Sequence, residues 1–222
     1  MKHTTLNQSF GMVLIALCVS LATAPVTASA EDNPWRLRFA VISMDPSGTS
    51  VVVQETGERI SYNSSSGTGF GIDLEYRASR RLGVDFGVLS ASPGLDVEVG
   101  AQPLTVIGSG DLNITPIYAA LNIHLTPDSR FDLYVGPLLA YVRYDGFKLS
   151  VDSELVEVFN TESDFGIGAV VGLDIGLGSG GWLLNAAVRY IDTTLEATSS
   201  DGGLGKTNID PTIYSLGVGF KF

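Results

Sequence analysis

The amino-acid sequence predicts an all-β chain whose eight antiparallel strands close into a transmembrane barrel. In eight segments, large apolar residues alternate with small or polar ones, as in strands that have two different faces. The links between these segments are alternately short and long. The apolar face carries no charge and ends in aromatic residues, which is typical of a barrel wall in contact with lipid.

The N-terminus has the features of a secretory signal peptide. A basic start is followed by an apolar run over residues 12–24 and by the small residues Ala28-Ser-Ala30. We expect residues 1–30 to be the signal peptide, cleaved after Ala30, and residues 31–222 to form one outer-membrane barrel. The single cysteine, Cys18, lies in the leader and follows Leu17, where a lipoprotein site has a small residue. The mature chain is therefore expected to contain neither a disulfide nor a lipid anchor.

The charge and hydrophobicity of the mature chain exclude two classes of protein. Residues 1–30 contain one lysine and no acidic residue, so their removal changes the net charge from −11 to −12. This acidic balance disfavours nucleic acid as a partner. No apolar run after the leader reaches the ~20 residues of a spanning helix. An exported chain with 45% hydrophobic residues must then bury them in a β core or place them on the outside of a barrel.

The predicted strands and links follow one order along the chain. The strands are Trp35–Met44, Thr68–Ala78, Leu82–Ala91, Asp111–Leu125, Phe131–Tyr144, Asp164–Leu177, Trp182–Ile191 and Asp210–Phe222. The second, fourth and sixth links are brief, whereas the others span residues 45–67, 92–110, 145–163 and 192–209. Compact soluble domains have a median loop of ~4–6 residues. Short periplasmic turns and long extracellular loops are typical of outer-membrane barrels, and residues 51–60 and 148–158 are suited to extend strands as hairpins.

One parity of every segment is large, apolar and uncharged, and we assign it to the lipid face. A Lys or Arg at the bilayer midplane would cost ~2–4 kcal/mol, so the absence of charge is informative. Aromatic residues gather at the segment ends, where membrane proteins place aromatic belts. These residues are Trp35, Tyr76, Phe131, Tyr141, Trp182, Tyr190 and Phe222.

The opposite parity faces the lumen and divides by depth. Its charged residues lie toward the periplasmic end and are predicted to form a polar plug of Arg36, Arg38, Glu75, Arg77, Asp85, His124, Asp132, Asp174 and Lys221. Its apolar residues lie under the long loops and are predicted to line an upper lumen of Ile42, Leu89, Tyr118, Leu138, Ala140, Val142, Val170 and Ile213. Charges in so narrow a barrel persist only when they are paired. An apolar pocket above such a plug would accept a hydrophobic solute from outside, while the plug would oppose its direct passage into the periplasm.

Pro116 interrupts the fourth predicted strand. Proline has no N–H to donate to a strand ladder. One hypothesis is that the wall opens near Pro116 and releases an apolar solute sideways into the membrane. The alternative is that Pro116 marks a bulge or a strand end at the rim of the barrel.

The closing third of the chain resembles the OmpW family of small outer-membrane barrels, which includes the AlkL-type importers. The resemblance is carried by Leu184-Asn-Ala-Ala-Val-Arg-Tyr-Ile-Asp192 and by the last segment, Ile209–Phe222. It implies an eight-stranded barrel with a hydrophobic lumen that passes small hydrophobic molecules and releases them laterally. Terminal Phe222 also resembles the signal recognised by the barrel-assembly machinery. The implied partners are outer-membrane lipid, small hydrophobic solutes and that machinery, with a monomer favoured.

An enzymatic or metal-binding function has little support. His124 is the only histidine of the mature chain, and a hydrolase would need a serine and an acid beside it. Ser90 and Ser215 are available, but no spacing connects either of them with His124. With one histidine, no cysteine and no EF-hand pattern in the loops, no metal or other cofactor is expected. The chain is predicted not to be an enzyme.

Three functions remain open. The first is a passive channel of the bacterial outer membrane that takes up small hydrophobic molecules. The second is a structural or adhesive barrel of the OmpX type, which acts through its extracellular loops. The third, a soluble exported binder resembling a lipocalin, is disfavoured by the uncharged wall and the aromatic end.

Overall fold

The computed structural model describes residues 33–47, 50–53, 59–100, 105–145, 148–151, 154–158, 160–199 and 202–222. The predicted signal peptide and its cleavage after Ala30 lie outside these ranges. In the part of the chain that is described, no helix has the length and apolar character needed to cross a membrane.

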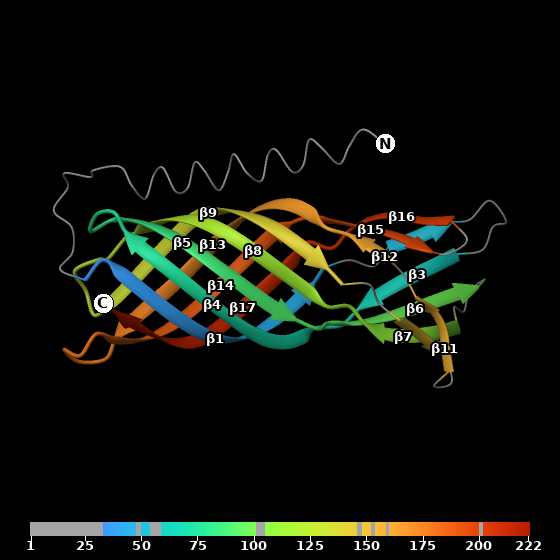
Figure 1. Ribbon diagram of the computed structural model, residues 1–222, viewed down its shortest axis with the longest axis horizontal. Helices are drawn as coiled ribbons and strands as arrows, with labels where there is room; N and C mark the ends of the chain where they lie inside the picture. The colour runs from blue at the N-terminus through green and yellow to red at the C-terminus, as the bar shows by residue number, and fades with distance from the viewer. Residues whose placement is uncertain are drawn as a thin grey trace.

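Eight strands form a closed antiparallel barrel, which confirms the predicted fold (Figure 1). Around the barrel the order is β1-β17-β14-β13-β9-β8-β5-β4, and β1 pairs with both β4 and β17. The strands are β1 (Trp35–Pro46), β4 (Gly67–Arg77), β5 (Leu82–Ala91), β8 (Ile114–His124), β9 (Phe131–Tyr144), β13 (Asp164–Gly176), β14 (Trp182–Asp192) and β17 (Pro211–Lys221).

The last strand closes the barrel against the first, as the sequence predicts. The β1–β17 register runs from Arg36 opposite Lys221 to Pro46 opposite Pro211. Beyond it, the N–H of Phe222 donates to the carbonyl of Trp35 at 3.0 Å, and the N–H of Trp35 donates to the carbonyl of Phe222 at 3.1 Å. The chain therefore remains paired to its final residue.

The long links carry strands of their own beyond one end of the barrel (Figure 1). A six-stranded sheet contains β2 (Ser50–Val53), β3 (Arg59–Ser64), β6 (Gly94–Gly100), β7 (Thr105–Asp111), β10 (Lys148–Val151) and β11 (Glu154–Val158). A three-stranded sheet contains β12 (Asn160–Glu162), β15 (Thr194–Ser199) and β16 (Gly202–Asn208). The predicted hairpins over residues 51–60 and 148–158 correspond to the antiparallel pairs β2–β3 and β10–β11.

One predicted boundary differs from the structure by three residues, whereas the others differ by at most two. The fourth strand was expected to begin at Asp111, but β8 begins at Ile114. Asp111 is instead the last residue of β7, where it pairs with Gly94 of β6. Leu112 then turns inward and is 3% exposed. Alternation alone did not reveal this turn, because the alternation of exposed and buried positions continues from Asp111 and Leu112 into β8.

The short turns lie at the other end of the barrel, together with the C-terminus (Figure 1). They span residues 78–81, 125–130 and 177–181. Gly178 and Gly181 have φ angles of 70° and 80°, a left-handed conformation that favours glycine. Because the short turns, the start of β1 and the C-terminus all lie at this end of the barrel, we identify it as the periplasmic end.

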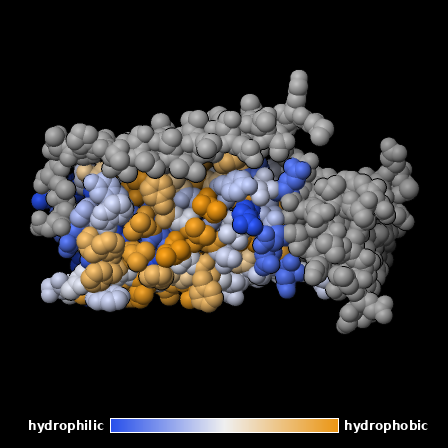
Figure 2. Space-filling model, in the orientation of Figure 1, coloured by the Kyte–Doolittle hydropathy of each residue, from blue (hydrophilic) through white to orange (hydrophobic). Residues whose placement is uncertain are grey.

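The outer face of the barrel is apolar. Leu216 is 67% exposed and Phe70 is 75% exposed, while residues next to them in sequence are more buried. Figure 2 shows hydrophobic side chains gathered over the barrel, with hydrophilic side chains toward the end where the hairpin strands begin. Aromatic pairs mark the ends of the wall. Their ring centroids are 4.8 Å apart for Trp35–Tyr76, 5.2 Å for Trp182–Phe220 and 5.1 Å for Tyr141–Phe165.

Candidate functional site: a lumen divided by polarity

The periplasmic half of the lumen is centred on Arg38, which is fully buried. Its Nε donates to Oδ1 of Asp174 at 3.1 Å and its Nη2 donates to Oδ2 of the same carboxylate at 2.7 Å. Nη2 also donates to Oε2 of Glu75. Two parallel bonds from one guanidinium to one carboxylate form a strong and directional pair. Arg38 thereby connects three strands across the lumen: β1, β4 and β13.

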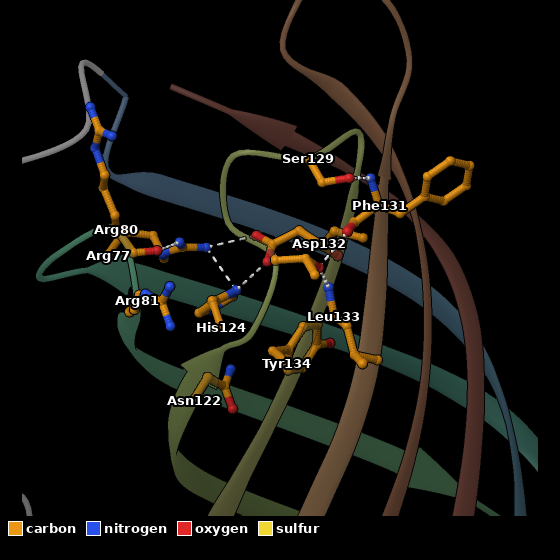
Figure 3. Close-up of polar contacts among 12 residues, drawn as sticks. Arg77, Arg80, Arg81, Asn122, His124, Ser129, Phe131, Asp132, Leu133 and Tyr134 are labelled. Carbon is orange, nitrogen blue, oxygen red and sulfur yellow. Dashed lines mark hydrogen bonds and ion pairs between the residues drawn. The ribbon is translucent and has the colours of Figure 1, made fainter.

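A second group of the polar plug converges on Asp132. Nη1 of Arg36 and Nη1 of Arg77 both donate to Oδ2 of Asp132, at 2.8 and 2.9 Å. The His124 ring lies between two carboxylates, with Nδ1 3.0 Å from Oδ1 of Asp132 and Nε2 2.7 Å from Oε1 of Glu75. Figure 3 shows Arg77, His124 and Asp132 pointing toward one another, while Phe131 points away. These four side chains close the lumen between β1, β4, β8 and β9.

Neutral side chains complete this network. Nδ2 of Asn185 donates to Oδ1 of Asp174 at 2.8 Å and to the hydroxyl of Tyr134 at 3.0 Å. The guanidinium of Arg38 lies 5.3 Å from the centroid of the Tyr134 ring, and Nδ2 of Asn122 donates to Glu75 at 3.4 Å. The strand parity places all three neutral residues inward, but the polar plug was predicted from charge and did not include them.

Two predicted members of the polar plug differ from the rest. Asp85 is fully buried, yet neither of its carboxylate oxygens has a hydrogen-bond partner among the described residues, and Nη1 of Arg38 is 3.9 Å from Oδ1. Lys221 is only half-buried and lies opposite Arg36 at the end of the β1–β17 register. The other seven predicted members are buried and joined by the contacts above.

A middle layer of Asp73, Tyr118, Arg189 and Ser215 lies above the polar plug. Nη2 of Arg189 donates to Oδ2 of Asp73 and its Nη1 donates to Oγ of Ser215, both at 3.0 Å. The Tyr118 hydroxyl donates to the other oxygen of Asp73, and its ring centroid lies 5.1 Å from the Arg189 guanidinium carbon. A Cβ at Gly87 would collide with the Tyr118 ring and with Asp73, so any larger residue would force one of these side chains to shift. Tyr118, expected among apolar residues, therefore also serves the polar layer.

The extracellular half of the lumen is filled by apolar side chains. All eight residues of the predicted upper lumen belong to one buried group, here called the apolar cluster. Its members are Ala40, Ile42, Met44, Leu89, Ala91, Leu112, Ile114, Tyr118, Ala120, Tyr134, Leu138, Ala140, Val142, Tyr144, Val170, Ala187, Ile191, Leu195, Ile209 and Ile213. Leu89, Val142 and Ile213 are 0% exposed. An apolar pocket was expected, but these side chains contact one another and are closed to solvent.

The sequence prediction missed part of the apolar cluster. Met44, Ile114 and Tyr144 continue the inward parity to the ends of their strands, so a longer reading of the same pattern could have found them. Leu112, Leu195 and Ile209 lie outside the barrel strands and pack over the lumen from the long links. All three residues share the inward parity of the nearest barrel strand, but the predicted lumen lining was not extended beyond the wall to include them.

Pro116 lies at a gap in one strand ladder of the wall. In the ladder between β5 and β8, Ile117 pairs with Val88, and the next recorded pair is Ile114 with Ala91. The two positions between them include Pro116, which pairs only with Val142 on the β9 side. The lost N–H of proline accounts for this gap.

A second gap lies on the other edge of β8. The β8–β9 ladder pairs Ala120 with Leu138 and then Ile123 with Val135, and it omits the two positions that include Pro137. Pro137 faces outward, whereas Pro116 is buried. Thus β8 has a weakened ladder on each side, at two different depths.

The described hydrogen bonds of the His124 ring are with charged side chains. Its ring nitrogens contact Glu75, Asp132 and Arg77. Ser215 bonds with Arg189 and with the carbonyl of Ala187, and neither it nor Ser90 is bonded to His124. Among the described residues, no group of three or more His, Cys, Asp or Glu side chains is placed to hold a metal ion.

The comparisons with known proteins agree with this architecture. The OprG outer membrane protein of Pseudomonas aeruginosa is 21% identical, with a TM-score of 0.62 over 87% of this chain and 98% of that chain. AlkL in lipid bilayers is 21% identical, with a TM-score of 0.57 over 88% and 93%. Neisserial surface protein A is 16% identical, with a TM-score of 0.52 over 85% and 97%. At these identities the likeness establishes a shared fold.

The family model gives the classification. No curated protein matches the chain. AlkL, whose type is included in the family that the closing third of the sequence resembles, is among these structural matches. The model of the family described as "Outer membrane protein beta-barrel domain" matches residues 14–222. The chain therefore belongs to this family of bacterial outer-membrane barrels.

Proposed function

We propose that this barrel is a passive channel for the uptake of small hydrophobic molecules. The observation that carries the proposal is the division of one narrow lumen into a charged periplasmic half and an apolar extracellular half. A barrel that served only as a scaffold could fill its whole length with a paired network like the polar plug. An apolar half beneath the extracellular end can bind a hydrophobic solute without the free-energy cost of removing water from polar side chains.

Entry would proceed by displacement of apolar side chains. Leu195 and Ile209 join the apolar cluster from the long links, and Met44, near the end of β1, contributes a flexible, unbranched side chain. A solute that replaces such contacts with its own keeps the compartment apolar. Water and ions would find no polar partner there, so the channel would select against them.

The polar plug would block direct passage to the periplasm. Its opening would separate buried ion pairs such as Arg38–Asp174, and removal of one partner from a buried pair costs ~3–5 kcal/mol. The solute would instead leave sideways at the gap beside Pro116, where the β5–β8 ladder omits two positions. This exit lies at the level of the apolar cluster, because Pro116 pairs with Val142, a member of it.

Uptake can be tested in vesicles whose outer leaflet is lipopolysaccharide, because apolar molecules cross a plain phospholipid bilayer unaided. The wild-type protein should accelerate entry of apolar members of a size-matched panel and leave polar members excluded. Leu138→Glu places a charge in the apolar cluster and should abolish the acceleration, while Leu138→Met keeps volume and polarity and should preserve it. Equal entry with and without protein would refute the channel.

The lateral exit has a separate test. Pro116→Ala restores an N–H at the gap and should slow apolar uptake several-fold while the barrel still folds. Leu89→Met, on the facing strand, is a control that keeps the gap. Unchanged uptake in Pro116→Ala would remove the exit and leave the channel itself standing.

One observation favours the alternative, a structural or adhesive barrel of the OmpX type. The apolar cluster fills its half of the lumen, and two sheets extend beyond the barrel. For such a barrel, Leu138→Glu would leave adhesion to a cell or matrix surface unchanged. Exchange of β10 and β11 for a short turn would abolish adhesion and leave uptake unaffected. The two functions therefore predict opposite responses to the same two variants.

A further inference from the structure

The guanidinium of Arg189 has more donors than partners. Arg189 is fully buried in the middle layer, where Nη2 bonds to Asp73 and Nη1 bonds to Ser215. Its Nε is buried and has no hydrogen-bond partner among the described residues. A buried N–H without an acceptor is unfavourable, so this atom is a position where an added acceptor would stabilise the protein.

The backbone of Arg189 lies at the level of the apolar cluster. Arg189 pairs with Val170 on β13 and with Ile213 on β17, and both residues belong to the apolar cluster. Nε is the guanidinium nitrogen closest to the wall, whereas Nη1 and Nη2 reach into the lumen toward Ser215 and Asp73. A molecule that occupies part of the apolar cluster would therefore meet Nε at its inner end.

The local charge selects a neutral acceptor over an anion. Asp73 neutralises Arg189, and the Tyr118 hydroxyl donates to the second oxygen of Asp73. Asp85 lies opposite Glu75 in the β4–β5 register, next to the pair formed by Asp73 and Gly87, and both of its oxygens lack a hydrogen-bond partner. A bound carboxylate would add a negative charge beside these acids, whereas a hydroxyl or carbonyl would not.

We propose that the middle layer is a polar end-group site for neutral amphipathic molecules. The ligands are medium-chain alcohols and ketones, whose oxygen accepts a hydrogen bond from Nε of Arg189 while the chain replaces side-chain contacts in the apolar cluster. An alkane of the same length gains only the apolar contacts. One added hydrogen bond should make the alcohol bind about five-fold more tightly than the alkane, after correction for their partition into lipid. The site deepens the proposed function and rests on it, because the ligand enters through the same lumen.

The Nε–H resonance of Arg189 reports this bond directly. Protein labelled with ¹⁵N-arginine in lipid nanodiscs would be titrated with 1-octanol, 2-octanone, n-octane and octanoate. The resonance can be assigned by its loss in Arg189→Lys and independently by its proximity to the methyl groups of Val170 and Ile213. We expect a saturable shift with the alcohol and the ketone, no shift of Nε–H with the alkane, and weaker binding of octanoate. The Nε–H of exposed Arg80 is the internal control and should not move.

The outcomes separate the end-group site from the channel. If n-octane and 1-octanol bind equally and the Arg189 resonance does not respond, the end-group site is overturned while hydrophobic uptake stands. If none of the four molecules perturbs any lumen resonance, the proposed channel fails as well. In Arg189→Lys, binding of 1-octanol should weaken about five-fold and that of n-octane should stay the same, and an equal loss for both would indicate a purely structural role.

Discussion

Replacement of Arg38 by methionine tests whether the polar plug is a coupled electrostatic network. Arg38 is the only partner cation that bonds to both Asp174 and Glu75 among the described contacts, with two bonds to the first and one to the second. Methionine fills much of the same space but leaves these carboxylates in a buried site without that charge. Breaking a buried ion pair by removal of one partner costs ~3–5 kcal/mol, so Arg38→Met should lower the free energy of unfolding by that amount.

The same experiment can show that the loss comes from stranded charge. Asp174→Asn in the Arg38→Met background removes one of the stranded carboxylates, and the two substitutions should be coupled by about 1–3 kcal/mol. Urea unfolding in phospholipid vesicles, followed by the fluorescence of Trp35 and Trp182 in the wall, gives the free energies. Arg80→Met is the matched control, because its ion pair with Asp128 is exposed at 67% and 75% and should contribute at most ~1 kcal/mol. A loss below ~1 kcal/mol for Arg38→Met, or independent effects at the two positions, would refute the coupled network.

Four further outcomes are expected. Val171→Arg, on the lipid face in the middle of β13, should lower the free energy of unfolding in vesicles by ~2–4 kcal/mol. Leu177→Arg, at the periplasmic end, should lower it by only ~0–1 kcal/mol. Equal losses for the two variants would contradict the assigned membrane position. Gly87→Ala places a Cβ against Tyr118 and Asp73 and should lower the free energy of unfolding by ~1–3 kcal/mol. Gly180→Ala should be neutral in the same assay, because the nearest atom to its new Cβ would be Cδ1 of Trp182 at 3.8 Å. The wild-type barrel should pass no steady ionic current in a planar bilayer, because the paired plug residues Arg36, Arg38 and Asp132 are at most 2% exposed, and a sustained current would argue against a closed plug. Phe222→Ala should reduce the amount of assembled barrel in cells, measured by heat-dependent gel mobility, if the exposed terminal ring is recognised during assembly.

The strand parity predicted the wall and much of the lumen because each strand has a fixed period of two. Arg38 and Val171 follow from that rule alone, since one face must meet the lumen and the other the lipid. The position of each lumen residue along the barrel axis could be predicted from the alternation of short and long links, because this alternation gives the direction of each strand. The fold was therefore accessible from the sequence.

The partners within the lumen were not accessible in the same way. Arg36 bonds to Asp132, 96 residues away, and this pairing depends on the tilt and stagger of strands that are not neighbours. The hydrogen bond from Tyr118 to Asp73 likewise crosses from β8 to β4, so a residue predicted to be apolar lining has a polar role. Leu112, Leu195 and Ile209 also fill the apolar cluster, and although they share the inward parity of the adjoining strands, the prediction did not extend the lumen beyond the wall.

The constant depth of the boundary between the two halves is an argument for function. Strands alternate in direction, so a boundary at one depth requires opposite orders of polarity in neighbouring strands. In β1 the charged Arg36 and Arg38 come before the apolar Ile42, whereas in β4 the charged Glu75 and Arg77 come last. Folding alone requires only that charges be paired somewhere in the lumen, and a polar network that ran its full length would meet that requirement. This opposite order in adjacent strands separates a half held by buried ion pairs from a half held by apolar contacts, which is the arrangement that the proposed channel for hydrophobic molecules requires.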